Sequence, residues 1–437
     1  MDIHDKTAIN KVFSEKLEEV TVAGWIQQVR DLGGLKFLKL QDRTGIIQIV
    51  LPKKKVTPEI FEIDYQEGDI LLVKGSVVPN NSAPKGLEIL PENIEVINKR
   101  AQEYPIAVTD KIETNPDKRY DYRFLDLRNR SIAHIFEIES TVAYALQEYF
   151  NQNEFLQFFS SKIVGSATES GANVFEIGYF DKKAYLAQSP QFYKQMMLMA
   201  GFEKVFEIGP VFRAEKHHTS RHLCEYTSID FEISYIKDQR DVMKTLQGAV
   251  SYALEKIKKD KTDILDELEV VIDNQPKEWP IITIPECNEI LKKEGKELGL
   301  YEDLDAEAEA IIGRYVKEKW KADFVFVDQY PWEVRPFYTM KDDNDPNLTK
   351  SFDLLYKGQE LTTGGQREHR VDILTKQATE KDFKLKEVDS YLQFFRNGAP
   401  PHGGSGTGIE RFVQKVLNLQ NIREARLLPR DPSRLHP

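Results

Sequence analysis

Residues 205–215 read Val-Phe-Glu-Ile-Gly-Pro-Val-Phe-Arg-Ala-Glu, and this stretch indicates how the larger part of the chain folds. Read with a period of two, it is a strand with one apolar and one charged face. The apolar face carries Phe206, Ile208 and Phe212, and the charged face carries Glu207, Arg213 and Glu215. Arginine and carboxylates on one open face could hold an anion and its metal.

A second strand returns after the basic loop Lys216-His217-His218-Thr219-Ser220-Arg221-His222. One face of this strand carries Tyr226, Ser228, Asp230 and Glu232. We predict an antiparallel hairpin with a charged face and a cationic tip. Two alternatives stay open. The charges also fit a solvated sheet face. His217, His218, His222 and Cys224 are potential zinc ligands, although their spacing matches no common zinc pattern.

Two further segments could complete such a site. Residues 400–408 read Pro-Pro-His-Gly-Gly-Ser-Gly-Thr-Gly, a glycine-rich turn that leads into a helix with Arg411 in its first turn. Glycine lets a ligand approach the backbone, and the start of a helix favours anions. Asp353 and Glu360 are carboxylates able to bind Mg²⁺ that also touches phosphates. Taken singly, these segments also fit an ordinary loop and two surface acids.

The N-terminal part has a different pattern. Strands are predicted at 20–26, 35–40, 46–51 and 70–75, with turn residues between them. About five short strands in under roughly 90 residues indicate a small closed barrel, of which the oligonucleotide-binding (OB) fold is one type. A barrel without a ligand fits equally well. We expect a barrel domain at 1–98, a charged linker at 99–129 and an α+β domain at 130–437 that begins with a helix at 130–152.

Composition sets outer limits on the function. The chain has 437 residues, too many for one ordinary core. It has only two cysteines, Cys224 and Cys287, which fits a reducing compartment. We find no signal peptide and no membrane-spanning run, so we expect a cytoplasmic location. The net charge of −11 argues against a general nucleic-acid binder, but a local basic stripe can still bind tRNA.

Together these segments resemble class II aminoacyl-tRNA synthetases. Residues 212–215 and the loop with Arg221 and His222 resemble the second motif of that class, and 406–411 resemble the third. The helix at 130–152 and the strand at 158–164 resemble the first motif, which builds the dimer interface. Residues 123–128, 188–194 and 429–431 resemble the aspartyl branch in its compact archaeal form. The resemblance covers essentially the whole chain. It implies an OB-fold anticodon-binding domain and a catalytic domain built on an antiparallel sheet flanked by helices.

The resemblance implies a homodimeric ligase that joins aspartate to tRNA through an aspartyl-adenylate, with ATP as co-substrate and Mg²⁺ as cofactor. Arg213 and Arg411 are the expected catalytic residues, because they would stabilise phosphate charge. The ATP site is expected to contain Arg213, Glu215, Arg221, His222, Leu223, Tyr226, Glu360, Gly408 and Arg411, with Tyr226 stacked under adenine. The aspartate site is expected to contain Glu169, Ser189, Gln191, Lys194, Arg213, Asp230, Thr363 and Arg367. Lys194 and Arg367 would hold the side-chain carboxylate. The expected metal ligands are Asp353, Glu360 and Thr363.

Three positions depart from the family pattern. Ser161 replaces the usual proline of the first motif, Ser170 replaces a glycine of the mobile loop that contains Glu169, and Thr363 replaces a serine near the metal. We expect these changes to affect the dimer strand, loop closure and metal contacts. None of them removes a charge.

Three rival functions share part of this pattern. An asparaginyl-tRNA synthetase shares nearly every motif, but that branch usually has a glutamate at the position of Lys194. A lysine beside Arg367 demands an anionic partner, since losing one partner of a buried pair costs about 3–5 kcal/mol. A paralogue that makes asparagine from aspartate, ATP and ammonia lacks the N-terminal barrel. An inactive synthetase-like tRNA-binding protein is disfavoured because every expected charged site residue is present.

The resemblance also implies a ligand for the barrel. Phe37 would stack on an anticodon base, with Arg30, Gln48 and Glu88 close to the bases, because single-stranded loops are read by stacking and edge hydrogen bonds. The alternative is that Phe37 faces the core of the barrel.

Two further positions concern which tRNA is charged. Some enzymes of this type charge only tRNA(Asp), and others also charge tRNA(Asn). Gln27 fits neither pattern, whereas Pro84 resembles the relaxed enzymes. Proline offers no backbone donor, so a discriminating contact would be lost and we expect tRNA(Asn) to be charged as well. Pro84 could also merely shape a turn.

Overall fold

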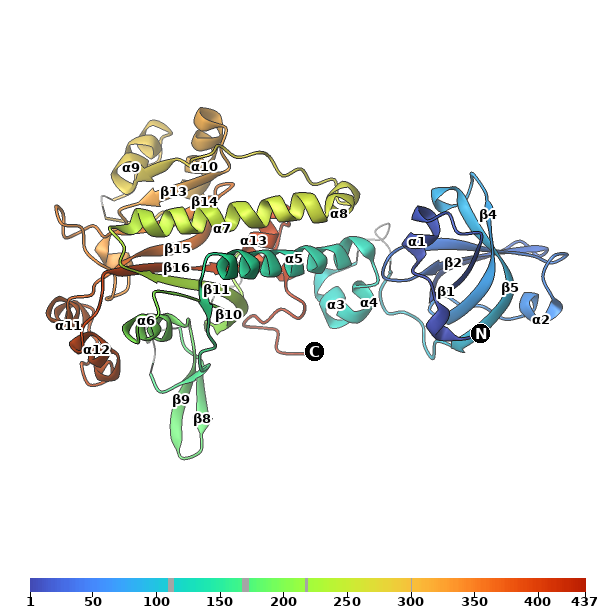
Figure 1. Ribbon diagram of the computed structural model, residues 1–437, viewed down its shortest axis with the longest axis horizontal. Helices are drawn as coiled ribbons and strands as arrows, with labels where there is room; N and C mark the ends of the chain where they lie inside the picture. The colour runs from blue at the N-terminus through green and yellow to red at the C-terminus, as the bar shows by residue number, and fades with distance from the viewer. Residues whose placement is uncertain (109–113, 167–172, 217–218, 300) are drawn as a thin grey trace. The chain divides into compact units, whose positions relative to one another are not determined.

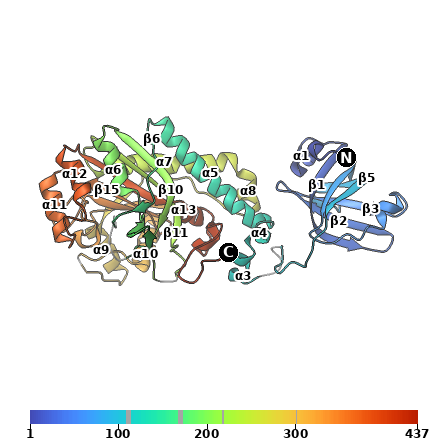
Figure 2. The same ribbon diagram turned by 90° about the horizontal axis from the view of Figure 1, so that it is seen from below.

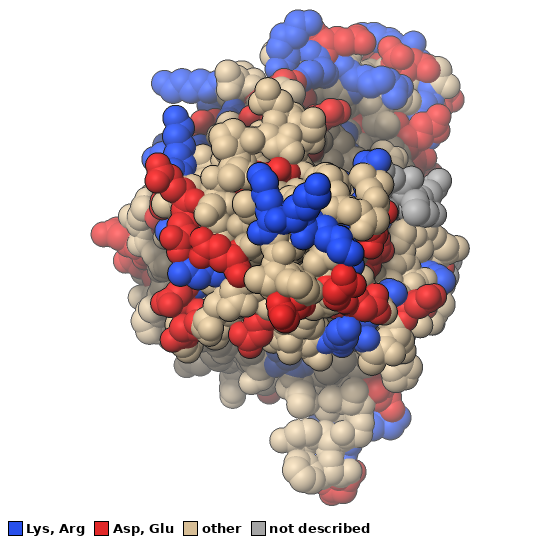
Figure 3. Space-filling view, turned by 90° about the vertical axis from the view of Figure 1, so that its right-hand side faces the viewer, with Lys and Arg blue, Asp and Glu red and all other residues tan. Residues whose placement is uncertain are grey.

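The computed structural model describes residues 1–108, 114–166, 173–216, 219–299 and 301–437. By its contacts the chain divides into two units, Met1–Ala133 and His134–Pro437. Figures 1 and 2 show the elements of each unit, and Figure 3 shows one face on which acidic and basic side chains are interspersed. In the residues described, we find no helix with both the length and the apolarity needed to cross a bilayer.

The first unit contains a closed barrel of five strands (Figure 1). These are β1 (Glu19–Asp31), β2 (Leu35–Gln41), β3 (Ile46–Pro52), β4 (Ile70–Pro79) and β5 (Leu87–Asn98), which pair in the order β1-β2-β3-β5-β4. The predicted barrel is therefore confirmed. Leu38 and Leu40 of β2 are fully buried, whereas Phe37, directly before Leu38, is partly exposed. Because side chains alternate along a strand, Phe37 lies on the outer face, and the alternative that placed it in the core is wrong.

Residues 99–129, expected as a linker, contain two short helices, α3 (Pro116–Asp121) and α4 (Arg123–Asp126). Arg123 and Asp126 are buried and form an ion pair at 2.6 Å, and Arg119 pairs with Asp126 at 2.8 Å. The contacts group these helices with the barrel unit. Each helix is shorter than the window of about 11 residues in which apolar periodicity becomes visible, so the sequence pattern did not indicate them.

The second unit is built on a sheet of eight strands in the order β12-β13-β14-β15-β16-β11-β10-β6. Their bounds are Ile281–Thr283, Phe324–Asp328, Ser351–Tyr356, Glu360–Arg367, His402–Gly408, Glu225–Ser234, Lys204–Phe212 and Leu156–Gln157, respectively. The predicted hairpin is β10–β11, in which Glu207 lies opposite Asp230. The sheet is antiparallel, as predicted, except for the edge pairs β12/β13 and β6/β10, which are parallel.

Strand β16 corrects one prediction. Residues 402–408 were expected in a turn, but they form a strand in the middle of the sheet, between β11 and β15. Its glycines are required by close neighbours. An added Cβ would lie 2.1 Å from a Glu232 carboxylate oxygen at Gly404 and 2.8 Å from an Asp230 oxygen at Gly406. Glycine usually indicates a turn, and the crowding that demands it here comes from residues far away in sequence.

Helices cover one face of the sheet. The principal ones are α5 (Arg130–Gln152), as predicted, and α7 (Gln239–Asp260), which run side by side in Figure 1. Phe150 of α5 stacks on Phe206 with ring centroids 5.1 Å apart and packs against Phe231 at 5.3 Å. Since side chains alternate along β11, the polar residues Ser228, Asp230 and Glu232 point to the opposite face.

The remaining helices flank the sheet or follow its strands. They are α6 (Gln191–Met199), α8 (Thr262–Glu267), α9 (Ile284–Lys293), α10 (Ala306–Trp320), α11 (Val371–Glu380), α12 (Asp389–Arg396) and α13 (Ile409–Val416). Helix α13 confirms the helix predicted after the glycines.

The segment after α5 differs from the strand expected at 158–164. Within 158–164 only Ile163–Val164 (β7) forms a strand, in a small sheet with β9 (Lys182–Leu186) and β8 (Glu176–Tyr179), and Ser161 lies outside it. Leu156, Phe159 and Ile163 of this segment are 42%, 79% and 50% exposed. A strand needs a hydrogen-bonding neighbour, and this segment is an apolar edge in the single chain.

Candidate active site

The polar face of the sheet lines a cavity of about 340 Å³. Its walls come from the β10–β11 hairpin, β15, the β16–α13 junction and the start of α6. The cavity brings together most of the residues predicted from sequence: Ser189, Gln191, Lys194, Arg213, Glu215, Arg221, His222, Leu223, Tyr226, Asp230, Glu360, Thr363, Arg367, Gly408 and Arg411. Four residues singled out in the sequence, Glu169, Ser170, His217 and His218, lie outside the described residues.

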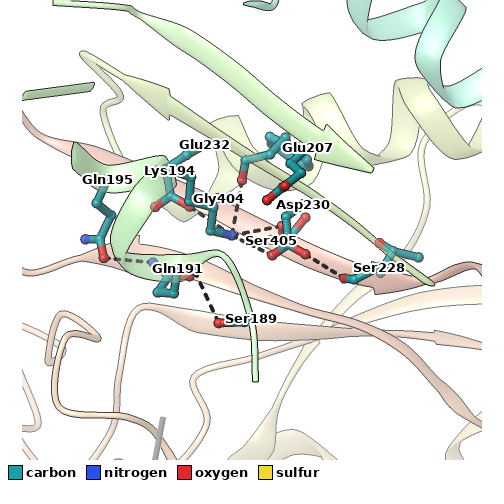
Figure 4. A network of polar contacts seen from close by, with 12 residues as sticks. Ser189, Gln191, Lys194, Gln195, Glu207, Ser228, Asp230, Glu232, Gly404 and Ser405 are labelled. Carbon is teal, nitrogen blue, oxygen red and sulfur yellow. Dashed lines mark hydrogen bonds and ion pairs between the residues drawn. The ribbon is translucent and has the colours of Figure 1, made fainter. Parts of the chain in front are cut away.

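A buried charge network forms one end of the cavity (Figure 4). Lys194, which is 1% exposed, lies 3.0 Å from Asp230 Oδ1 and 3.1 Å from Glu232 Oε2. Arg367 donates from Nε to Glu232 Oε1 at 2.9 Å and from Nη2 to Gly404 O at 3.0 Å. Burial opposes ionisation of Glu232, but Arg367 and Lys194 outweigh it and hold the pKa of this carboxyl below its usual value. Ser228, Asp230 and Glu232 are all buried, so the alternative of a solvated sheet face is wrong for β11.

A row of neutral groups supports the start of α6. Gln191 donates to Gln195 Oε1 at 2.9 Å, and Ser189 Oγ accepts from the backbone N–H of Gln191. Gln195 also lies 2.8 Å from His402 Nε2. Burial lowers the pKa of His402 to about 4, so this histidine is neutral at pH 7. Gln191 is thereby fixed with its side chain at the cavity wall.

An aromatic ring, that of Tyr226, also lines the cavity. The Arg213 guanidinium lies 5.8 Å from the centroid of the Tyr226 ring. The backbone N–H of Arg213 donates to Cys224 O at 2.9 Å, which anchors the end of β10 to the second strand. A Cβ at Gly408 would lie 3.6 Å from the Tyr226 ring, so glycine leaves that side of the ring open. A flat base could stack in this place with its phosphates toward Arg213.

Alternating charges build the other end of the cavity. Arg411 donates to the backbone oxygens of Glu360 at 3.0 Å and Arg221 at 3.4 Å, and lies 3.2 Å from the Glu360 carboxylate. Arg221 pairs with Glu309 of α10 at 2.9 Å. Burial, together with the nearby Glu360, raises the pKa of Glu309 to about 7, although Arg221 opposes this shift. Arg221 and Arg411 both line the cavity, and guanidinium groups there suit the binding of an anion.

Oxygen donors suited to a hard cation lie beside this end. Asp353 of β14 and Thr363 of β15 are direct partners across the strands, and Thr363 Oγ1 donates to Glu360 Oε1 at 3.2 Å. Two carboxylates and a hydroxyl match the oxygen ligands that Mg²⁺ prefers. In the described part of the chain, no group of three or more His, Cys, Asp or Glu side chains is placed to bind a metal. A cation held here would therefore need further oxygens from water or from a phosphate ligand.

Several residues of the site were missed in the sequence. Glu232 was placed on the polar face by its period-two spacing, but its role between Lys194 and Arg367 depends on strand pairing. Arg335 lines the cavity and pairs with Asp353, and Glu309 holds Arg221. Arg335 follows a 3-10 turn, so no periodic signal could have indicated it.

The barrel residues predicted to read the anticodon lie on four neighbouring strands: Arg30 on β1, Phe37 on β2, Gln48 on β3 and Glu88 on β5. Arg30 lies directly opposite Phe37 in the β1–β2 pair. Gln48 donates to Glu88 Oε2 at 2.7 Å, and Asn80 donates to the same oxygen at 2.9 Å.

The two positions expected to govern tRNA choice lie on the same unit. Gln27 occupies a β-bulge, where the register of β1 against β2 shifts. Pro84 begins a 3-10 turn, Pro84–Gly86, that is closed by a hydrogen bond from Asn80 N to Gly86 O. Asn80 therefore connects the Pro84 turn to Glu88.

Comparison with known proteins shows which families the two units resemble. Residues 20–97 match the OB-fold nucleic acid binding domain family, and residues 115–432 match the family of tRNA synthetases class II (D, K and N). A crystal structure of asparaginyl-tRNA synthetase from Pyrococcus horikoshii with asparaginyl-adenylate is 33% identical, covers 99% of each chain and has a TM-score of 0.90. Aspartyl tRNA synthetase from Entamoeba histolytica is 29% identical, covers 99% of this chain and 93% of its own, and also has a TM-score of 0.90. Fold and site thus define a class II aminoacyl-tRNA synthetase.

Curated relatives identify the branch of this class to which the chain belongs. An aspartate–tRNA(Asp) ligase of Pyrococcus abyssi is 44% identical over 436 residues, which is 99% of this chain and 100% of the relative. An aspartate–tRNA(Asp/Asn) ligase of Aeropyrum pernix is 44% identical over 424 residues, which is 96% of this chain and 95% of the relative. The chain belongs to the aspartate–tRNA ligase family.

Proposed function

We propose that the chain activates L-aspartate with ATP and transfers it from an aspartyl-adenylate to the 3′ end of tRNA(Asp). The observation that carries this proposal is the pair of buried cations, Lys194 and Arg367, in a cavity that is also lined by Arg213, Arg221 and Arg411.

The aspartate would lie at the buried network. Lys194 and Arg367 would hold its side-chain carboxylate, because both line the cavity and both are held in place by ion pairs with Glu232. Asp230 and Gln191 would bind the ammonium group, and Ser189 lies beside them. The formal charges of Lys194, Arg367, Asp230 and Glu232 cancel. A carboxylate and an ammonium group could therefore enter together without leaving a net buried charge.

The ATP would lie between Tyr226 and the arginines. Adenine would stack on Tyr226 over Gly408, and Arg213 would stabilise the charge that builds on the α-phosphate when the aspartate carboxylate attacks. Arg221, His222 and Arg411 would hold the outer phosphates, with Glu215 and Leu223 lining the same wall. Mg²⁺ held by Asp353, Glu360 and Thr363 would neutralise phosphate charge when bound. Positioning and charge stabilisation supply the catalysis, and no covalent nucleophile is needed.

The asparaginyl alternative is disfavoured by the same pocket. Likeness of fold cannot separate the two activities, since solved asparaginyl and aspartyl enzymes both resemble this chain closely. Lys194 does separate the two activities. An asparagine amide between Lys194 and Arg367 would leave cationic donors facing an NH₂ group, and unpaired buried donors are costly.

The tRNA would bind both units in the same reaction. The barrel, at 1–98, would read the anticodon with Phe37, Arg30, Gln48 and Glu88, and the domain at 130–437 would carry the chemistry, with 99–129 between them. Pro84 favours charging of tRNA(Asn) as well as tRNA(Asp). A homodimer would cover the apolar edge at Leu156, Phe159 and Ile163.

Aspartate-dependent exchange between pyrophosphate and ATP tests the activity directly. The wild type with Mg²⁺ should catalyse the exchange, and Arg213→Ala should reduce it by roughly 10²–10³-fold, the usual loss for one charge-stabilising donor. The thermal midpoint should change little, because Arg213 lies at the cavity wall. No exchange by the wild type would refute the proposed function.

A further inference from the structure

Arg335 lines the cavity and pairs with Asp353, but it has no role in the reaction proposed above. Its guanidinium Nη2 lies 2.8 Å from Asp353 Oδ1, and the Arg335 and Asp353 side chains are only 8% and 7% exposed. Its Nε donates to Ser351 Oγ at 3.1 Å, and the guanidinium lies 3.9 Å from the centroid of the Tyr330 ring. Contacts on three sides hold this cation in place, unlike a surface arginine.

We propose that Arg335 is a positioning residue that supplies the counter-charge of Asp353, so that the Asp353–Glu360 carboxylates bind a divalent cation only when it arrives with the phosphates of ATP. This inference rests on the proposed function of the same cavity.

The charge balance of this end supports the proposal. Glu360 has its own arginine, Arg411, at 3.2 Å, just as Asp353 has Arg335. Four carboxylates interact electrostatically in this part of the site, and each also interacts with at least one arginine. The carboxylates are those of Asp303, Glu309, Asp353 and Glu360, and the arginines are Arg213, Arg221, Arg335 and Arg411. A lone divalent cation would meet carboxylates that already have guanidinium partners, Asp353 with Arg335 and Glu360 with Arg411.

The phosphates of ATP reverse this balance. They bring several negative charges into the end of the cavity that Arg221 and Arg411 already line, and a divalent cation then restores neutrality. Mg²⁺ gives up its water reluctantly and is usually bound by one or two carboxylates together with substrate phosphates. Arg335 would thus prevent an ATP-free cation from occupying the site, while keeping the Asp353 carboxylate ionised and correctly placed.

Cation binding without ATP tests the proposal. Binding of Mn²⁺ followed by electron paramagnetic resonance should be at least tenfold weaker for the ATP-free wild type than for the protein with a non-hydrolysable ATP analogue. Arg335→Met should bind Mn²⁺ without ATP at least tenfold more tightly than the wild type. Arg335→Lys, which keeps the charge, should behave as the wild type does.

A thermal measurement separates this role from a merely structural one. Arg335→Met should lose stability in EDTA and recover part of it in millimolar Mg²⁺, because the cation replaces the missing guanidinium. The matched control is Arg123→Met, which breaks another buried arginine–aspartate pair, at 2.6 Å, and should not respond to Mg²⁺. Arg335→Gln serves the same purpose if the methionine variant does not fold.

Two outcomes would overturn the proposal. One is a wild type that binds Mn²⁺ equally well with and without the ATP analogue. The other is an Arg335→Met or Arg335→Gln protein that gains no ATP-free cation binding. These measurements involve neither aspartate nor tRNA, so failure of the proposed activity would appear separately, in the exchange assay.

Discussion

Arg367 donates to one oxygen of Glu232 at 2.9 Å while Lys194 lies 3.1 Å from the other oxygen of the same carboxylate. Glu232 is completely buried, so it acts as a shared anion that fixes both cations before any substrate arrives. Such prior placement removes the need to order two long side chains during binding. The choice of amino acid should therefore depend on this trio.

Replacing Lys194 should expose that dependence. Lys194→Met should lower kcat/KM for aspartate in the exchange assay by roughly a hundredfold, since truncating one member of a buried charged pair costs about 2–5 kcal/mol. The preference for aspartate over asparagine should shrink, and KM for ATP should change little. Lys162→Met is the matched control, because Lys162 also pairs with a buried glutamate, Glu207, at 3.1 Å, but does not line the cavity. Equal losses in both variants would mean general destabilisation and contradict the assignment.

Glu139 of α5 should make stability depend on pH. Burial and the nearby Glu410 raise the pKa of Glu139 to about 7, with Arg426 opposing the shift. The folded chain therefore binds this proton more tightly than the unfolded chain, so the associated stability is present at low pH and is lost as pH rises toward 7. Glu139→Gln mimics the protonated side chain. Its free energy of unfolding relative to the wild type should increase by about 1–2 kcal/mol from pH 5 to pH 8.

Urea unfolding at the two pH values measures this difference. Glu255→Gln is the control, since the Glu255 side chain is 71% exposed on α7. A difference between Glu139→Gln and wild type that is the same at both pH values would contradict the prediction.

Phe159 should be essential for assembly. It is 79% exposed, and with Leu156 and Ile163 it forms an apolar edge after α5. The wild type should be a dimer by light scattering at micromolar concentration, and Phe159→Glu should shift it toward monomer, because a buried unpaired charge opposes an interface. Val271→Glu, at an equally exposed apolar residue of the same unit (75%), should leave the dimer intact. A fully active monomeric wild type would refute the dimer, and Ser161 would then be the first residue to examine.

Pro84 should influence which tRNA is charged. The Pro84 turn is tied through Asn80 to Glu88, which in turn accepts a hydrogen bond from Gln48. Pro84→Lys should sharpen the preference for tRNA(Asp) over tRNA(Asn), measured as the ratio of kcat/KM values for the two transcripts, by about one or two factors of ten, the value of one base contact. Pro84→Ala restores the backbone N–H without adding a charge. It therefore separates the effect of the backbone donor from the effect of the lysine charge. A wild-type preference for tRNA(Asp) beyond about a hundredfold would defeat the relaxed assignment.

The fold followed from the sequence wherever local pattern and tertiary environment agree. The β10–β11 hairpin has a strict period of two, and α5 was predicted because its apolar residues recur at helical spacing. Strand β16 could not be recognised, because its glycines are demanded by Asp230 and Glu232 on a strand more than 150 residues earlier. Local composition then gives the wrong answer.

The residues of the site also fall into those that the sequence predicted and those that it did not. Residues inside recurring motifs, such as Arg213 and Arg411, were found because the motif itself identifies them. Arg335 and Glu309 were not, since they come from an irregular segment and from the buried side of α10. Their partners, Asp353 and Arg221, were singled out in the sequence without them. A single sequence contains no sign that a buried acid will find its counter-charge in a distant segment.

The position of β16 has a consequence for synthesis on the ribosome. The strand occupies the middle of the sheet, yet its residues, 402–408, are translated only after all seven of its sheet companions. A nascent chain can pair β10 with β11 and β14 with β15, but the two halves stay separate until the glycines emerge. During that interval the Lys194–Glu232–Arg367 trio is divided between the halves, and the polar faces of β11 and β15 are open to solvent and to chaperones. A message cut short before residue 402 would therefore yield no partly active enzyme, only two half-sheets without their shared strand.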